Sequence, residues 1–309
     1  MNLKPINQTN LYGLKKTMME LVNLYNNKKL PNKILLSGDK GCGKCTLAFH
    51  LVNFILSKNE QFSYDLKNFE INRENKSFKL TINSTNPNLT LIDTYDQKKN
   101  IDINQIRDLV LDLNKSSFNN KERFVIIDNV GTLNLNSANA LLKNLEEPPN
   151  NTFFILINNN RSILPTLKSR CINFRIFLSH QESIDITNKL LSDDIFKYIN
   201  KDLLNYFYTP GFFYNVISFF TANNYDLKNY TVKNLLDLII KENLYKKNDF
   251  IKNIAFEYFE LYCRKNIFSL RQKTLDHFSY FLNRINDTKR FNLDEDSLFM
   301  EIEYKVLNG

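Results

Sequence analysis

The sequence predicts an α/β protein in which a five-stranded parallel sheet carries helices on both faces and is followed by helices alone. Two observations favour this fold class. Apolar, strand-like runs alternate with helical segments as far as about residue 178, which is the pattern of a parallel sheet. Beyond that point the strand signals stop, and apolar residues recur at helical spacing. The expected strands cover residues 33–37, 89–93, 123–128, 153–158 and 171–176.

A glycine-rich run at residues 38–46 joins the first strand to a helix expected over residues 46–56. It fits the phosphate-loop pattern G-x-x-x-x-G-K-[ST], in which backbone N–H groups cradle phosphates and the lysine reaches the β- and γ-phosphates. The last position should carry a hydroxyl for Mg²⁺, but the sequence has Cys45, a poor ligand for a hard cation. Thr46 comes one residue late, about 100° around the helix. We expect a degenerate nucleotide site formed here by Gly38, Gly41, Gly43, Lys44, Cys45 and Thr46.

Two alternatives remain for this run. It can be a glycine-rich turn that merely packs, because motif matches carry false positives. Cys42 and Cys45 also form a C-x-x-C pair, which is found in zinc sites and in thioredoxin-like redox sites. Structural zinc takes four nitrogen or sulfur ligands, and the sequence has no second cysteine pair. We therefore expect no metal site.

The third expected strand ends in a carboxylate, Asp128, which is typical of the Walker B motif of nucleotide-binding proteins. An ATPase needs a general base next to it, whereas this chain has Asn129, whose amide can orient water but cannot accept its proton. The fourth expected strand ends in Asn158, a candidate sensor of a γ-phosphate. Alone, Asp128 and Asn129 would fit a strand that ends in a turn.

A helix and a tripeptide complete the pattern. The helix covers residues 136–147, with Asn134 or Asn136 as its N-cap and Pro148 at its end. The tripeptide Ser-Arg-Cys at residues 169–171 precedes the last strand. On the tripeptide alone, Arg170 would be a residue of an ion pair at a strand start.

Residues 124–171 closely resemble the delta-prime subunits of the bacterial DNA polymerase III clamp loader, which belong to the AAA+ superfamily. The shared features are the apolar strand ending in Asp, the helix N-S-A-N-A-L-L-K-x-L-E-E-P-P, the sensor strand and the S-R-C tripeptide. Residues 11–13 and 29–31 agree as well. The resemblance is specific over residues 1–178 and loose beyond them.

The resemblance implies three domains: an AAA+ P-loop domain at residues 1–178, a small helical lid at 179–225 and a helical oligomerisation (collar) domain at 226–309. It implies a subunit that helps to load the sliding clamp onto primed DNA, with the gamma/tau ATPase and delta subunits, the clamp and DNA as partners. Arg170 would act as an arginine finger in a neighbouring subunit's ATP site. No cofactor would be required, although ATP or ADP can be bound without hydrolysis.

Three departures separate the chain from the ATPase subunits of such loaders. Cys45 and Asn129 replace the magnesium ligand and the general base, and Phe212 follows Pro210 and Gly211 where a sensor arginine would be. Residues 57–88 carry no cysteine, so no zinc module is expected; this stretch fits a loop or an extension. We expect no ATPase activity from the chain itself, which would serve within the polymerase holoenzyme. The alternatives are a catalytically active clamp-loader ATPase or other AAA+ ATPase, and a P-loop small-molecule kinase.

Composition limits the class of protein. The 309 residues suffice for two or three domains with their own cores, and no run of ~18 apolar residues is present to span a membrane. The polar start does not fit a signal peptide, and four unpatterned cysteines suit a reducing cytoplasm. A net charge of +8 permits contact with nucleic acid, but a Lys- and Asn-rich chain can equally reflect genome composition.

Overall fold

The computed structural model describes residues 3–94, 100–114, 121–205, 208–247, 249–266, 272–291 and 293–307. The chain divides into two compact units. The first comprises Met1–Ile186 with Thr209–Gly211, and the second comprises Thr187–Tyr208 with Phe212–Gly309. The boundary expected between a lid and a collar at residue 225 falls within the second unit and stays a prediction.

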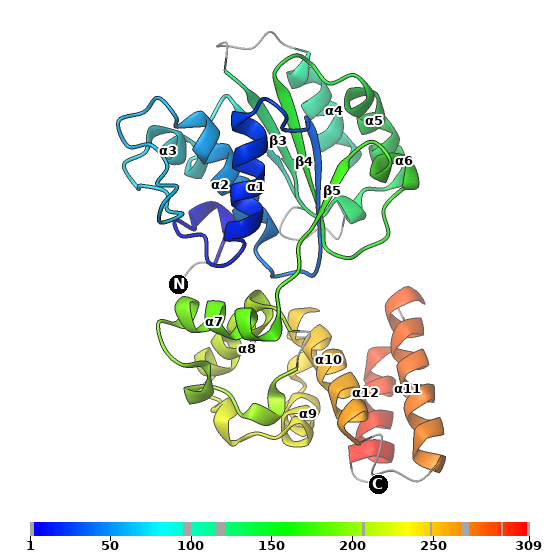
Figure 1. Ribbon diagram of the computed structural model, residues 1–309. Coiled ribbons are helices and arrows are strands. Elements are labelled where there is room, and N and C mark those ends of the chain that lie inside the picture. The colour runs from blue at the N-terminus through cyan, green and yellow to red at the C-terminus, as the bar shows by residue number, and fades with distance from the viewer. Residues whose placement is uncertain are drawn as a thin grey trace. The chain divides into compact units, whose positions relative to one another are not determined.

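The first unit is built on a parallel sheet of five strands in the order β2-β3-β4-β1-β5 (Figure 1). This arrangement, followed by helices, confirms the predicted fold class. Because all strands run in the same direction, their carboxyl ends lie along one edge of the sheet. The strands are β1 (Lys33–Ser37), β2 (Leu89–Ile92), β3 (Arg123–Ile127), β4 (Thr152–Asn158) and β5 (Ile172–Arg175).

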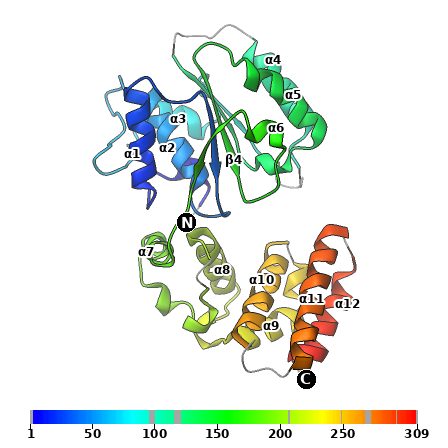
Figure 2. The same cartoon turned by 45° about the vertical axis from the view of Figure 1, so that its right-hand side comes forward.

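Helices cover both faces of this sheet, with α1 to α3 on one side and α4 to α6 on the other (Figures 1 and 2). The alternation of side chains along each strand produces the two cores: Leu36 packs with the first group of helices, and Leu35 with the second. The helices are α1 (Lys15–Asn26), α2 (Lys44–Leu56), α3 (Lys76–Ile82), α4 (Ile103–Leu113), α5 (Leu135–Glu146) and α6 (Pro165–Lys168).

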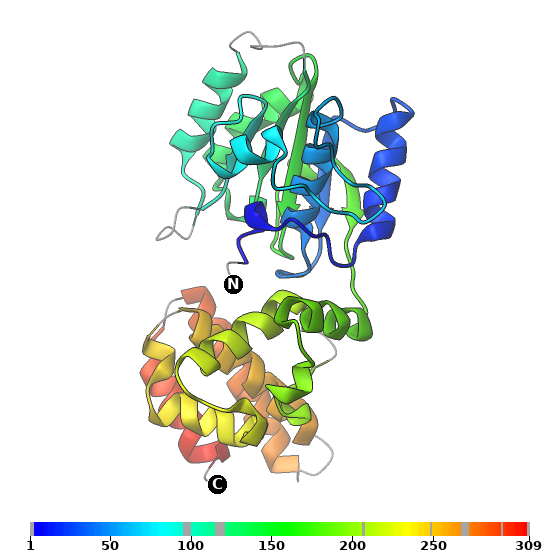
Figure 3. The ribbon, with the colours of Figure 1, turned by 90° about the vertical axis from the view of Figure 1, so that its left-hand side faces the viewer.

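Residues 57–88, which were expected to form a loop or an extension, include a helix. They contain α3, which Asn75 caps by accepting a hydrogen bond from the Phe78 backbone N–H at 2.8 Å, and which lies in front of the strands in Figure 3. Tyr64 and Phe69 are buried in the core beneath α2. Of the two alternatives, a loop or an extension, the loop is therefore wrong for residues 76–82, because the core contacts of α3 supply what its short apolar pattern does not show.

The helix expected over residues 136–147 is α5, and of the two candidate N-caps, Asn134 and Asn136, it is Asn134 that caps it. The Asn134 side chain accepts a hydrogen bond from the Ser137 backbone N–H at 2.8 Å. α5 ends at Glu146, two residues before Pro148, which cannot continue a helix. The cap and the proline together fix the length of α5, and they place Glu146 in its last turn.

Among its described residues, the second unit contains helices joined by loops and no strand. α9 packs against α10, and α11 packs against both α10 and α12. Large aromatic side chains such as Phe213, Phe259 and Phe281 are fully buried, as expected for core residues rather than exposed base-stacking platforms. The helices are α7 (His180–Leu191) and α8 (Pro210–Ala222), which both begin in the first unit, and α9 (Val232–Lys241), α10 (Asp249–Asn266), α11 (Gln272–Phe291) and α12 (Glu295–Ile302).

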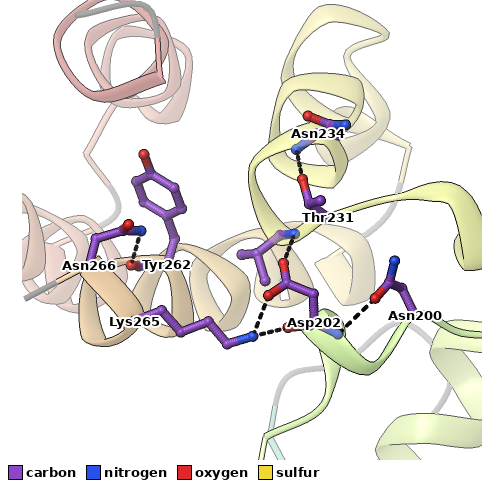
Figure 4. A network of polar contacts seen from close by, with 8 residues as sticks. Asn200, Asp202, Thr231, Asn234, Tyr262, Lys265 and Asn266 are labelled. Atoms are coloured by element: carbon purple, nitrogen blue, oxygen red, sulfur yellow. Dashed lines mark hydrogen bonds and ion pairs between the residues drawn. The ribbon is translucent and has the colours of Figure 1, made fainter. Parts of the chain in front are cut away.

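The Asp202 carboxylate contacts two other segments of this unit (Figure 4). Asp202 Oδ1 lies 2.7 Å from Nζ of Lys265 in α10, and Asp202 Oδ2 accepts a hydrogen bond at 2.8 Å from the backbone N–H of Val232, at the start of α9. Burial raises the pKa of Asp202, but the bonds from Lys265 and Val232 outweigh it and leave a lowered value. One carboxylate thus ties the segment around Asp202 to both helices.

No helix among the described residues is long and apolar enough to cross a membrane.

Candidate functional site

The glycine-rich run forms the predicted loop between β1 and α2. At Gly38 a Cβ atom would lie 2.2 Å from the backbone oxygen of Ile176, so any other residue would collide with the start of the chain after β5. Gly43 has a φ of +92°, a conformation that favours glycine, and it is the N-cap of α2. The run therefore has the strand–loop–helix geometry that a phosphate loop requires.

Lys44 lies inside this loop and is only 3% exposed. Its Nζ donates hydrogen bonds to the backbone oxygens of Gly38 at 2.8 Å and Asp39 at 2.6 Å, and to Cys42 Sγ at 3.6 Å. Burial lowers the pKa of Lys44, although Cys42, Asp128 and Asp39 oppose the shift. The ammonium group therefore makes its hydrogen bonds within the loop itself.

Cys45 replaces the magnesium ligand, and its thiol hydrogen-bonds the Asp128 side chain. Burial, and then the charge of Asp128, raise the pKa of the Cys45 thiol well above its ordinary value. Burial and the neighbouring Asp93 raise the pKa of Asp128, against the opposing effects of Asn129, Cys45 and Lys44. A protonated thiol is not a metal ligand, so this pair does not fit a Mg²⁺ site. Thr46, the next residue of α2, is half-buried.

Asn129 occupies the position of the missing general base, and both ends of its amide are engaged. Its Nδ2 donates to Asp93 Oδ1 at 2.8 Å, and its Oδ1 accepts from Asn159 Nδ2 at 2.6 Å. Its backbone, at a φ of +57°, donates to Asp128 Oδ1 at 2.7 Å. The amide is therefore a bridge between the ends of β2 and β4 and is already committed to two partners.

The predicted sensor Asn158 bonds to its own loop. Its Nδ2 donates to the Arg161 backbone oxygen at 2.9 Å, and its Oδ1 accepts from the Arg161 N–H at 3.2 Å. Its backbone oxygen accepts from the Gly38 N–H at 3.3 Å, which joins it to the phosphate loop through the main chain. Its neighbour Asn160 donates to the Asp39 side chain.

A further segment contacts the phosphate loop within the first unit. The Thr209 hydroxyl donates to the Lys40 backbone oxygen at 2.7 Å, and the Gly211 N–H donates to the Gly41 oxygen at 3.0 Å. A Cβ atom on Gly211 would lie 2.8 Å from the Gly41 Cα, so glycine is needed there. Phe212 follows where the sensor arginine would be, and its ring lies 4.1 Å from that of Tyr208 in the second unit.

Arg170 lies apart from these residues, just before β5. Its NH1 donates to the Thr166 backbone oxygen at 2.9 Å, and its NH2 pairs with Glu146 at the end of α5. The side chain keeps 31% of its surface exposed. The ion-pair interpretation of Arg170 is thus correct as far as this chain alone is concerned, and it leaves the guanidinium accessible.

The cysteines and His50 have structural surroundings. Cys42 and Cys263 are buried, and Cys171 is half-buried with burial raising its pKa to about 11. His50 Nδ1 lies 2.9 Å from the Tyr64 hydroxyl, and its Nε2 lies 3.2 Å from the Gln8 oxygen. In the described part of the chain, no three His, Cys, Asp or Glu side chains are grouped so that they could hold a metal ion.

The sequence analysis missed the residues that complete the site: Asp93, Asn159, Arg161 and Thr209. The first two follow strand ends, and the only signal for them is that parallel strands end at one edge. The residues that it did predict from the loop, together with Asp128, are brought together, whereas Asn158 reaches the loop through its backbone only.

The sequence matches the family described as DNA polymerase III, delta subunit, over residues 13–179. The chain belongs to this family. It is 33% identical to the DNA polymerase III subunit delta' of Pseudomonas aeruginosa over 139 residues, which are 45% of this chain and 40% of that protein. It is 24% identical to the subunit delta' of Buchnera aphidicola subsp. Acyrthosiphon pisum over 283 residues, or 87% of this chain and 84% of that protein. The resemblance to delta-prime clamp-loader subunits is thereby confirmed.

A gamma/tau subunit matches as well. The DNA polymerase III subunit gamma/tau of Mycoplasma genitalium is 32% identical over 172 residues, which are 55% of this chain and 27% of that protein. The chain thus matches less than half the length of this relative and of the Pseudomonas protein. Membership of the family places the chain among DNA polymerase III subunits, and the relatives that match include both delta' and gamma/tau subunits.

Proposed function

We propose that the chain is a non-hydrolysing subunit of a DNA polymerase III clamp loader, which helps to load the sliding clamp onto primed DNA. Its partners would be gamma/tau-type ATPase subunits, a delta subunit, the clamp and DNA, in the cytoplasm. The observation that carries the proposal is the state of its own nucleotide site. Both groups that ATP hydrolysis requires are replaced, and both replacements are held by neighbours: Cys45 by Asp128, and Asn129 by Asp93 and Asn159.

Nucleotide binding and nucleotide hydrolysis make different demands on this site. The loop backbone and Lys44 keep the geometry that holds phosphates, so ATP or ADP can be bound as a structural ligand. A Mg²⁺ ion would lack its hydroxyl ligand, and no carboxylate at position 129 can accept a proton from water. The degenerate site therefore supports binding without turnover.

Arg170 is the catalytic contribution that we propose for this chain. A guanidinium supplied in trans stabilises charge on a transferring phosphoryl group and is typically worth ~10³–10⁵ in rate. Arg170 is partly exposed just before the edge strand β5, where a neighbouring subunit can reach it. Its side chain contacts Thr166 and Glu146 and none of the residues of its own nucleotide site among the described residues, which fits a role in another subunit's site.

The test measures the isolated chain and its partners together. The purified protein should release no phosphate from ATP above the rate of a buffer blank, with or without primed DNA. The tagged protein expressed in its own cells should co-purify with gamma/tau-type and delta subunits. ATP turnover by the isolated chain at the rate of an ordinary ATPase, about 1 s⁻¹ or more, would instead support the active-ATPase alternative.

A further inference from the structure

Two neighbours from different helices hold the Arg170 side chain in place. The first is the Thr166 backbone oxygen in α6, which accepts from NH1 at 2.9 Å. The second is Glu146, the last residue of α5, which pairs with NH2. The guanidinium is therefore fixed at two of its three nitrogens before any partner arrives.

The two contacts leave much of the guanidinium available. Arginine has five N–H donors in a planar fork, and phosphate oxygens are bound by pairs of them. Within the described residues, Thr166 and Glu146 are the partners of the Arg170 side chain, and each takes up one terminal nitrogen. The remaining N–H groups can meet a phosphoryl group without breaking the ion pair, so Glu146 need not be displaced for Arg170 to act.

Glu146 lies at the C-terminus of α5, where a negative charge is unfavourable. The last turn of a helix presents unsatisfied carbonyl oxygens, which disfavour a carboxylate there. Glu146 stands at this point, half-exposed, and Pro148 follows within two residues. Its neighbour Glu147 is also exposed, but it has no contact with Arg170 in the structure. The ion pair with Arg170 offsets the unfavourable position of the Glu146 carboxylate.

We propose that Glu146 is a positioning residue for Arg170, which holds the guanidinium in the orientation that the neighbouring ATP site uses. The inference rests on the proposed function of Arg170. An arginine on a surface normally loses considerable side-chain freedom when it binds a phosphate. Holding it in advance removes part of that cost from the transition state of the neighbouring site.

The experiment uses the reconstituted clamp loader with four forms of this chain: wild type, Glu146→Ala, Glu146→Gln and Glu147→Gln. We expect Glu146→Ala to lower clamp- and DNA-stimulated kcat about fivefold at the affected site, with KM for ATP unchanged. Glu146→Gln keeps a hydrogen-bond acceptor and should lose less than about twofold. Glu147→Gln, the matched control, should equal wild type. Size-exclusion chromatography should show the same assembly for all four.

A double mutant separates positioning from a general structural effect. If Glu146 acts only through Arg170, then adding Glu146→Ala to Arg170→Ala lowers turnover no further. An equal further loss in that background, or wild-type turnover in Glu146→Ala while Arg170→Ala is impaired, would overturn the positioning role alone. Wild-type turnover in Arg170→Ala itself would overturn the proposed function of the finger, and the positioning role with it.

Discussion

Replacing Asn129 by glutamate, the residue that an active site of this kind would carry, should destabilise the protein instead of activating it. The Asn129 amide nitrogen lies 2.8 Å from Asp93 Oδ1. A glutamate at position 129 brings a second negative charge toward Asp93. Two like charges about 4 Å apart repel by roughly 4 kcal/mol at an effective dielectric constant of 20. Both residues are half-buried, so solvent and side-chain movement should reduce the cost to roughly 1–3 kcal/mol.

The assay is urea denaturation of Asn129→Glu and of Asn129→Gln, which has the same length without the charge. The difference between their free energies of unfolding isolates the repulsion. Repulsion raises the pKa of a carboxyl group in the folded state, so the cost is present at pH 8 and shrinks as the pH falls toward 4.5 and the group is protonated. Adding Asp93→Asn should remove it. Equal stability of the two variants at pH 8 would refute this account of the site.

Two further outcomes follow from buried groups. Because Nε2 of His50 must donate to the Gln8 oxygen, its Nδ1 accepts from Tyr64, and burial lowers the pKa of His50 from 6.5 to about 4. As the pH falls, the unfolded state therefore binds a proton before the folded state does. The free energy of unfolding, measured by denaturation, should fall by about 3 kcal/mol between pH 6.5 and 4, and by much less in His50→Gln. The same dependence on pH in both proteins would contradict this role of His50. Lys44→Met should abolish any binding of a fluorescent ATP analogue without harming assembly. The control variant Lys40→Met should bind the analogue as wild type does. An assembly defect in a folded Lys44→Met protein would contradict a vestigial site.

The strands and the phosphate loop could be predicted from the sequence because their signals are local. Each observed strand begins or ends within one residue of its expected position, as β3 does at Ile127, where residue 128 was expected. The polar residues on either side of an apolar run mark where the strand begins and ends. The N-cap of α5 could be predicted for the same reason, because Asn134 lies three residues before Ser137, whose backbone N–H donates to its side chain.

The partners within the site could not be predicted, because they depend on the order of the strands. Asn129 meets Asp93 and Asn159 only because β3 lies between β2 and β4. The pairing of Arg170 with Glu146 joins the turn before β5 to the end of α5, 24 residues apart in the sequence. The short helix α3 was missed for a related reason: its stability comes from burial of Phe78 against distant residues.

The most direct test of the account measures ATP hydrolysis by a reconstituted clamp loader that contains Arg170→Ala or Arg170→Lys in this chain. Arg170 is partly exposed and Glu146, its ion-pair partner, is half-exposed, so both variants should fold and assemble. We predict that clamp- and DNA-stimulated turnover falls at one neighbouring site, and that lysine rescues it poorly because it lacks the guanidinium fork. Turnover and clamp loading equal to wild type in both variants would contradict the claim that this chain contributes its arginine to another subunit's ATP site.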